Sequence, residues 1–267
     1  MPRLVLLGDS ILDNASYAYP GPDTATVLRA LLGDAWQVDL IARDGATMPE
    51  LPSQLTELDG RPDVAILSIG GNDVTRHLDL LEPAATTTTA LLGTLGAIAD
   101  GFGARYDAAL ADTQQRVERL VACTIYEVAL SGPPRAELAR VPLSLLNDRI
   151  VRAAARAGTE VLDLRTVCTD PDDFVLEIEP SARGAAKIAA AIAAIVQHGQ
   201  PGPAARVYAV RQGAALTAPL SRVSARDRTS AGADRLPDHE APQGASCALA
   251  SRESRAASAG ETGDGAA

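Results

Sequence analysis

The 267-residue chain has few aromatic residues and less basic than acidic charge. Aromatic side chains make up 3% of it, and 24 Lys+Arg stand against 34 Asp+Glu, for a formal net charge of −10. Binding to phosphates needs clustered Lys and Arg, so this balance argues against a nucleic-acid partner. Because hydrophobic residues still reach 46%, the core must be built from aliphatic side chains.

Cysteines and long apolar runs are also scarce. Cys123, Cys168 and Cys247 are widely spaced without a Cys-x-x-Cys pair, which predicts reduced thiols and neither a disulfide framework nor a zinc site. The longest apolar run, 188–196, has nine residues, whereas a bilayer span needs about 20. We therefore expect no membrane insertion. The apolar run at the N-terminus is too short for a secretory signal, which favours a cytoplasmic location.

The character of the sequence changes near residue 200. Before this point short aliphatic runs alternate with helical patterns, and after it Pro, Gly, Ser, Ala and Arg dominate. Residues 200–267 have few apolar side chains to offset the entropy of ordering. We expect them to form a low-complexity, disordered C-terminal tail, with a brief ordered start at 206–210. Residues 1–199 are predicted to form a single domain.

Five short aliphatic runs are predicted strands, because continuous apolar runs suit strands buried on both faces. The predicted strands are 3–7, 37–42, 64–69, 120–124 and 160–164. The helical patterns are 24–32, 49–58, 87–116 with breaks at Gly101 and Gly103, 137–157 and 182–197. This alternation predicts an α/β fold, a three-layer α/β/α sandwich around a parallel five-stranded sheet. The expected strand order is the flavodoxin-like 2-1-3-4-5, with ligands at the carboxyl ends of the strands.

Candidate functional residues follow the first three predicted strands. The first strand leads into a Gly-Asp-Ser segment at 8–10, and Ser10 there can act as a nucleophile if a base and oxyanion donors are near. After the second strand Gly45 offers a backbone N–H, and after the third Asn72 offers a side-chain amide. Taken singly, each is also explained as a turn residue, and Asn72 or Asp73 as a helix cap.

Taken together, these segments resemble the SGNH hydrolase superfamily, also called GDSL esterases and lipases. The resemblance is carried by residues 8–11, by Gly45 and by Gly70-Gly71-Asn72-Asp73, in this order on an alternating β/α pattern, and it spans about residues 3–197. It implies a serine hydrolase of esterase or lipase type that acts on a small-molecule ester without a cofactor. It makes Ser10 the nucleophile, and the N–H groups of Ser10 and Gly45 with the Asn72 amide the oxyanion hole.

The last block of that family is altered in this chain. The family has Asp-x-x-His, usually followed by Pro, just before the last helix. Here Pro180, Ser181 and Gly184 keep the register, so Leu176 stands where the aspartate is expected and Glu179 where the histidine is expected. Both residues of the usual base are therefore absent.

Three hypotheses follow from this substitution. Glu179 can replace the histidine as the base if burial or a neighbour such as Asp9 raises its pKa above about 4.3. A histidine from elsewhere can supply the base, and His77 is better placed than His198 or His239, although an exposed helical position is the more ordinary explanation of His77. Alternatively, the protein is a non-catalytic pseudoenzyme or binding module that keeps the pocket.

Four further residues are possible pocket residues because of their places at the same sheet edge: Asp9, Asp73, His77 and Tyr126. An acidic run at 170–173 is interpreted as a solvated loop, since a metal site needs convergent ligands of defined geometry. We expect no metal.

Overall fold

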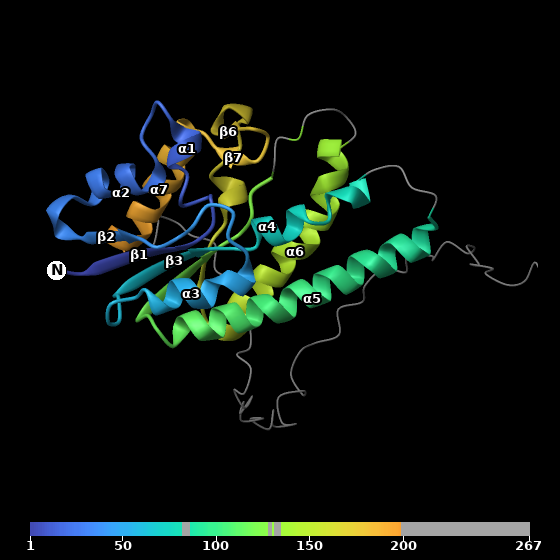
Figure 1. Ribbon diagram of the computed structural model, residues 1–267, viewed down its shortest axis with the longest axis horizontal. Coiled ribbons are helices and arrows are strands. Elements are labelled where there is room, and N and C mark those ends of the chain that lie inside the picture. Colours follow the sequence, from blue (N-terminus) through green and yellow to red (C-terminus); the bar gives the residue numbers. More distant parts are fainter. Residues whose placement is uncertain (82–85, 128–129, 131–134, 199–267) are drawn as a thin grey trace, which may run out of the picture. The chain divides into compact units, whose positions relative to one another are not determined.

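Five parallel strands form the central sheet of the computed structural model, which describes residues 1–81, 86–127, 130 and 135–198 (Figure 1). The strand order β2-β1-β3-β4-β5 confirms the predicted flavodoxin-like order. The strands are β1 (Arg3–Gly8), β2 (Gln37–Leu40), β3 (Val64–Ser68), β4 (Arg119–Cys123) and β5 (Glu160–Leu162). The predicted tail at 200–267, with its ordered start at 206–210, lies outside the described residues. The domain boundary therefore stays a prediction.

Helices cover both faces of the sheet and confirm the three-layer architecture. The larger helices are α2 (Thr24–Leu32), α3 (Leu51–Thr56), α5 (Thr88–Gln114), α6 (Arg135–Ala157) and α7 (Ala182–His198). The shorter ones are α1 (Ala15–Ala18), η1 (Gly33–Ala35), η2 (Met48–Glu50), α4 (Gly71–Thr75), η3 (Leu78–Leu81), η4 (Leu164–Thr166) and η5 (Pro171–Asp173). A two-stranded antiparallel hairpin, β6 (Phe174–Val175) and β7 (Glu179–Pro180), lies outside the main sheet.

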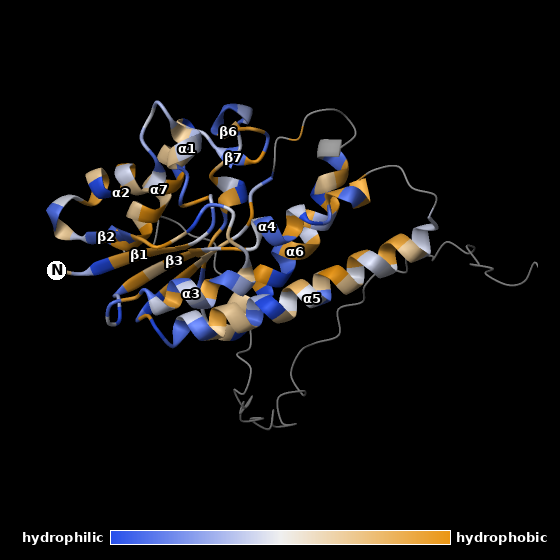
Figure 2. Cartoon of the chain, viewed as in Figure 1, coloured by the Kyte–Doolittle hydropathy of each residue, from blue (hydrophilic) through white to orange (hydrophobic). Residues whose placement is uncertain are grey.

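The core consists of two aliphatic layers, one on each face of the sheet. Alternate residues of β1 point into the two layers. Val5 and Leu7 pack with α3, α5 and α6, whereas Leu4 and Leu6 pack with α2 and α7. The central strands are accordingly mostly hydrophobic in Figure 2. Because both faces are covered, these strands show continuous apolar runs instead of alternation, which is why the sequence pattern identified them.

The predicted breaks at Gly101 and Gly103 do not occur, since α5 runs without interruption from Thr88 to Gln114. A glycine within a helix costs about 1 kcal/mol relative to alanine, and packing against α6 offsets this. At Gly103 a β-carbon would lie 3.3 Å from the Arg149 side chain, so the missing side chain permits close contact between α5 and α6. The prediction of a break was wrong because tertiary packing outweighs local propensity here.

The exit of β1 is fixed by an unusually close backbone contact. Gly8 has φ +125°, and a β-carbon on it would lie 1.7 Å from the Ser68 carbonyl oxygen. The Gly8 N–H donates to Gln54 Oε1 at 2.8 Å, and Gln54 Nε2 donates to the Gly8 carbonyl at 2.7 Å. These contacts determine where the chain leaves the sheet and therefore where residues 9 and 10 lie.

We predict that Gly8→Ala prevents stable folding, because neither backbone partner at this contact can move aside. Gly60→Ala is the matched control, since Gly60 also has positive φ (+68°) but a β-carbon there meets nothing within 4 Å. Its expected cost is only about 1–2 kcal/mol of unfolding free energy. Chemical denaturation followed by circular dichroism measures both. Equal stabilities of the two variants would contradict the role given to the Gly8 contact.

Candidate active site

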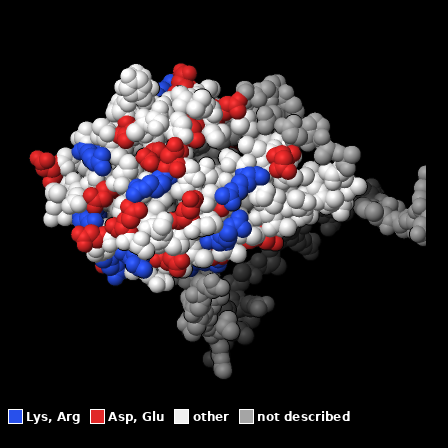
Figure 3. All heavy atoms as spheres, viewed as in Figure 1, with Lys and Arg blue, Asp and Glu red and all other residues white. Residues whose placement is uncertain are grey.

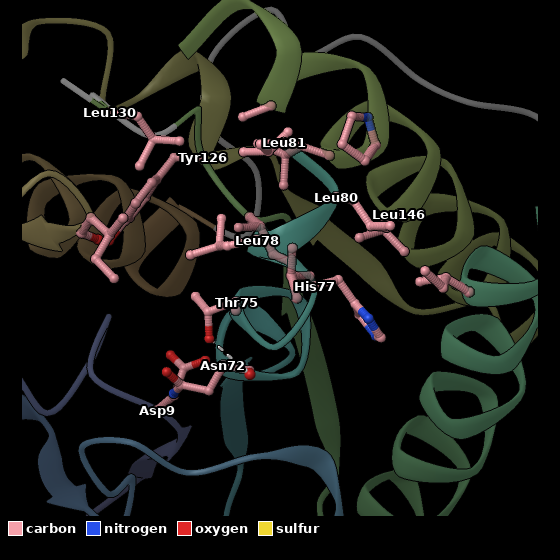
Figure 4. Close-up of a pocket in the computed structure, with 18 of the residues that line it drawn as sticks. Asp9, Asn72, Thr75, His77, Leu78, Leu80, Leu81, Tyr126, Leu130 and Leu146 are labelled. Atoms are coloured by element: carbon pink, nitrogen blue, oxygen red, sulfur yellow. Dashed lines mark hydrogen bonds between the residues drawn. The ribbon is translucent and has the colours of Figure 1, made fainter. Parts of the chain in front are cut away.

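A cavity opens at the carboxyl ends of β1, β3 and β4, beside α4, α5 and α6 (Figure 4). It encloses about 960 Å³, including its open mouth. Four polar residues lie along one part of it: Asp9, Ser10, Asn72 and Glu179. Most of the remaining lining is aliphatic and includes Leu78, Leu81, Ile98, Leu130, Leu143 and Leu146. The site therefore combines a small polar region with a deep apolar space.

Ser10 and Glu179 come together at the polar end of this cavity. Ser10 lies in the turn after β1, where Ile11 N–H donates to Asp9 Oδ1 at 3.2 Å, and its own N–H donates to no described residue. Glu179 lies on β7, and its carboxyl interacts with the Ser10 hydroxyl. Both side chains are largely buried, at 6% and 9% exposed. A carboxyl group thus occupies the place beside the serine hydroxyl that a base requires.

The two other candidate oxyanion donors lie on neighbouring loops. Asn72 lines the cavity, and its Nδ2 donates to the Ala46 carbonyl at 3.0 Å, which leaves the second Nδ2 hydrogen available. Gly45 directly precedes Ala46 and has φ +76°, and its N–H donates to no described residue. Gly45 is exposed and does not line the cavity itself. The Asn72–Ala46 bond therefore ties the loop that carries Gly45 to the polar end of the cavity.

The remaining candidate residues occupy different places. Asp73 is buried but does not line the cavity, and its Oδ2 accepts from Met48 N–H at 3.0 Å. His77 lines the cavity, yet its ring points away from Asp9 and Asn72 in Figure 4. Tyr126 lines the cavity and its hydroxyl donates to the Ile178 carbonyl at 2.6 Å. Tyr126 thereby holds the residue that precedes Glu179.

Residues 6–187 match the model of the GDSL-like lipase/acylhydrolase family. The chain belongs to this family. Membership confirms the resemblance seen in the sequence and makes the protein a member of a hydrolase family whose substrates are small-molecule esters. No curated protein sequence matches the chain.

Several solved structures share the fold of this GDSL family member. LAE5, an alpha/beta hydrolase enzyme from the metagenome of Lake Arreo, is 21% identical with a TM-score of 0.54, and the match covers 75% of this chain and 96% of that one. Phospholipase A1 from Streptomyces albidoflavus NA297 is 15% identical with a TM-score of 0.56, covering 72% and 98%. Axe2, an acetylxylan esterase from Geobacillus stearothermophilus, is 18% identical with a TM-score of 0.51, covering 74% and 94%. At these identities the likeness shows the fold and nothing finer.

Two neighbouring carboxyl groups at the GDSL site have raised pKa values. Burial raises the pKa of Asp9 to about 7, the Ile11 N–H bond opposes this rise, and the charge of Glu179 adds to it. Burial also raises the pKa of Glu179, although the adjacent Ser10 hydroxyl lowers it in part and the charge of Asp44 raises it. Asp9 Oδ2 and Glu179 Oε2 are buried and accept no hydrogen bond from the described residues. Both groups are therefore held at a cost in free energy.

The hairpin that carries Glu179 explains why no aspartate assists it. Leu176 and Glu177 form the turn between β6 and β7 with φ values of +49° and +71°. The Leu176 side chain, at the position where the family has aspartate, is 75% exposed. This side chain faces solvent on the turn, so the residue that would orient a histidine at 179 has no counterpart here.

The acidic run at 170–173 is not entirely a solvated loop, and this prediction was wrong for Asp173. Asp173 is fully buried, and its Oδ2 accepts from Lys187 Nζ at 2.6 Å and from Thr169 N–H at 3.0 Å. The Asp173 carbonyl accepts from Ser181 N–H at 2.9 Å, two residues after Glu179. Asp173 therefore fastens the segment that carries Glu179 to α7.

Further residues that shape the site carry no recognisable sequence signal. Asn147 on α6 donates to the Ile125 carbonyl and accepts from Ile125 N–H, both at 2.8 Å, and so fixes the loop after β4. Tyr17 donates to the Asp44 carboxylate, and Asp13 accepts from Asp44 N–H. These are long-range contacts between single polar residues, which neither periodicity nor a motif predicts.

No cluster of three or more His, Cys, Asp or Glu side chains in the described ranges is arranged to hold a metal ion. No described helix has the length and apolarity needed to span a bilayer. Cys123 and Cys168 are both buried free thiols, and burial raises the pKa of each.

We predict that Asp9→Asn changes how stability depends on pH. The pKa of Asp9 is about 7 in the folded state against 3.8 for an unperturbed group. Between these values the folded protein still holds a proton that the unfolded chain has released, so its stability falls as pH rises from about 4 to 7. Asparagine does not titrate, so its stability relative to wild type should rise over this window by up to about 4 kcal/mol. Urea unfolding at pH 5 and pH 8 captures about 2.6 kcal/mol of this rise.

Asp34→Asn, which removes an exposed carboxylate on η1, before β2 and so at the opposite edge of the sheet from Ser10, serves as the control. Its stability relative to wild type should be the same at both pH values. A parallel pH dependence of Asp9→Asn and wild type would contradict the raised pKa.

Proposed function

We propose that the protein hydrolyses carboxylic esters with apolar acyl groups, with Ser10 as the nucleophile and Glu179 as the general base. The observation that carries this proposal is the interaction of the Ser10 hydroxyl with the buried Glu179 carboxyl. Glu179 forms no ion pair with a described Arg or Lys, so its negative charge is not neutralised by a basic side chain. A base with a raised pKa is better matched to proton transfer near neutral pH.

The reaction begins when Glu179 accepts the proton of the Ser10 hydroxyl while Ser10 Oγ attacks the ester carbonyl carbon. The carbonyl π electrons move to oxygen, and this oxyanion is stabilised by the N–H groups of Ser10 and Gly45 and by the Asn72 amide. Collapse of the intermediate breaks the bond to the alcohol oxygen, which takes the proton from Glu179. Water then attacks the acyl-serine with Glu179 again as base, and the carboxylic acid leaves as Ser10 is restored.

The lining of the cavity supports an apolar acyl group. Beyond the polar end, Leu78, Leu143 and Leu146 together with Ile98 and Ile125 line the wall. Removal of methylene groups from water is worth about 0.8 kcal/mol each. An acyl chain of several carbons would therefore gain binding free energy here that an acetyl group cannot gain.

His77 is the weaker candidate for the base because its ring points away from Asp9 and Asn72 (Figure 4). A pseudoenzyme that binds a ligand in the same cavity is the alternative from another functional class.

We predict that Glu179→Gln lowers kcat/KM for p-nitrophenyl octanoate by about 10²–10⁴-fold, as expected for loss of a general base. Ser10→Ala should reduce turnover to the uncatalysed background. Because the pKa of Glu179 is raised and the base acts deprotonated, kcat/KM of the wild type should increase with pH through a value above 4.5 and then level off.

His77→Ala is the control and should retain wild-type kcat/KM. If turnover survives in Glu179→Gln and is abolished in His77→Ala, the histidine is the base. Equal rates for wild type and Ser10→Ala would reject the enzyme proposal, and a gain in Glu179→His would then identify a scaffold that has lost its base.

We predict that Leu78→Trp lowers kcat/KM for octanoyl esters more than for acetyl esters, because the larger side chain fills the apolar part of the cavity. Leu78 is only half-buried, so the substitution can be accommodated without unfolding. Leu31→Trp, at an exposed position on α2, is the matched control and should alter neither rate. An equal loss for both chain lengths in Leu78→Trp would contradict acyl binding at this wall.

A further inference from the structure

A group of polar residues close to Glu179, which do not themselves line the cavity, is held together by hydrogen bonds. The Tyr17 hydroxyl on α1 donates to both carboxylate oxygens of Asp44, at 3.0 and 3.1 Å. The Asp44 N–H donates to Asp13 Oδ2 at 3.0 Å. The charges of Glu179, Asp44 and Asp13 all act on Tyr17, whose pKa burial and these contacts raise to about 12. We call Asp13, Tyr17 and Asp44 the acidic rim.

The acidic rim has no basic partner among the described residues. Elsewhere acidic and basic side chains are paired, as in Arg119 with Glu160 and Arg156 with Asp107, and the face in Figure 3 shows the two signs interspersed. Arg43 immediately precedes Asp44 but is directed elsewhere. Its guanidinium pairs with Glu57 at 2.6 Å and donates to the Ile41 carbonyl at 2.8 Å. The negative charge at the rim is therefore not neutralised by the nearest arginine in the sequence.

A second, independent observation concerns Glu179, which lines the cavity and lies close to the acidic rim. Glu179 is nine-tenths buried, and its Oε2 has no hydrogen-bond partner among the described residues. Asp9 Oδ2 is in the same state. Buried carboxylate oxygens without a partner are costly, and a positively charged group in the cavity mouth would reduce that cost. The Glu179 carboxylate therefore adds its negative charge to that of the acidic rim.

We propose that the alcohol portion of the ester substrate carries a positive charge, as a quaternary ammonium or a protonated amine. This inference rests on the proposed function and names its substrate class. The cation would lie beside the hydrogen-bonded Asp44 carboxylate and Tyr17, on the side of Glu179, while the acyl chain fills the apolar cavity. Carboxylates attract the charge, and an aromatic face binds an ammonium group through its quadrupole. An anionic alcohol portion would be repelled at the same place.

The test compares two esters of equal shape and different charge, octanoylcholine and its neutral carbon analogue 3,3-dimethylbutyl octanoate. The wild type should favour the cationic ester in kcat/KM by roughly tenfold at low salt, and the preference should shrink as salt screens the exposed carboxylates. Asp44→Asn should reduce the ratio of the two kcat/KM values. Asp34→Asn, which removes an exposed carboxylate elsewhere, should leave the ratio at its wild-type value.

Failure of this inference is distinguishable from failure of the proposed function. Hydrolysis of both esters without a preference, unaltered in Asp44→Asn, would overturn the cation site and leave the esterase intact. If neither ester is hydrolysed, calorimetry with Ser10→Ala decides the question. Tighter binding of octanoylcholine than of the neutral ester, weakened by Asp44→Asn, would support the cation site in a non-catalytic protein. Equal binding, or none, would reject it.

Discussion

The contact between Gly8 and the Ser68 carbonyl is the constraint on which the site depends. It brings the ends of β1 and β3 so close that no side chain fits between them, and Gln54 holds the same glycine through both its backbone groups. Ser10 follows two residues later, and Asn72 follows four residues after Ser68. The relative placement of nucleophile and oxyanion donor is therefore decided by backbone packing in the sheet, and little freedom remains for the loops.

The carboxyl groups around Ser10 are arranged at the expense of stability. Asp9 and Glu179 lie close enough for the charge of one to raise the pKa of the other, and each keeps a buried oxygen without a partner. A protein selected for stability alone would pair or expose such groups. Their retention beside a serine is the pattern expected where stability is given up for chemistry or binding.

The sequence was sufficient to predict the sheet because its strands are buried on both faces and appear as uninterrupted aliphatic runs. Ser10, Asn72 and Glu179 could likewise be identified as site candidates from the sequence, since each follows or precedes a recognisable element. The continuity of α5 through Gly101 and Gly103 was not, because it depends on how closely α6 approaches. The burial of Asp173 and the bond between Tyr17 and Asp44 join residues that are brought together only by the folded chain. Local patterns carry no information on such pairs.

The Asp173–Lys187 pair has a practical consequence for chemical labelling. Lys187 is the single lysine of the 267 residues, and its amine is hydrogen-bonded to a carboxylate that is completely out of solvent. Among these residues an amine-directed reagent therefore has one side chain to modify. That side chain is also the fastening of the hairpin that holds Glu179. The rate at which an acylating dye or a cross-linker reacts there would report how often the Lys187–Asp173 bond opens, without any engineered label.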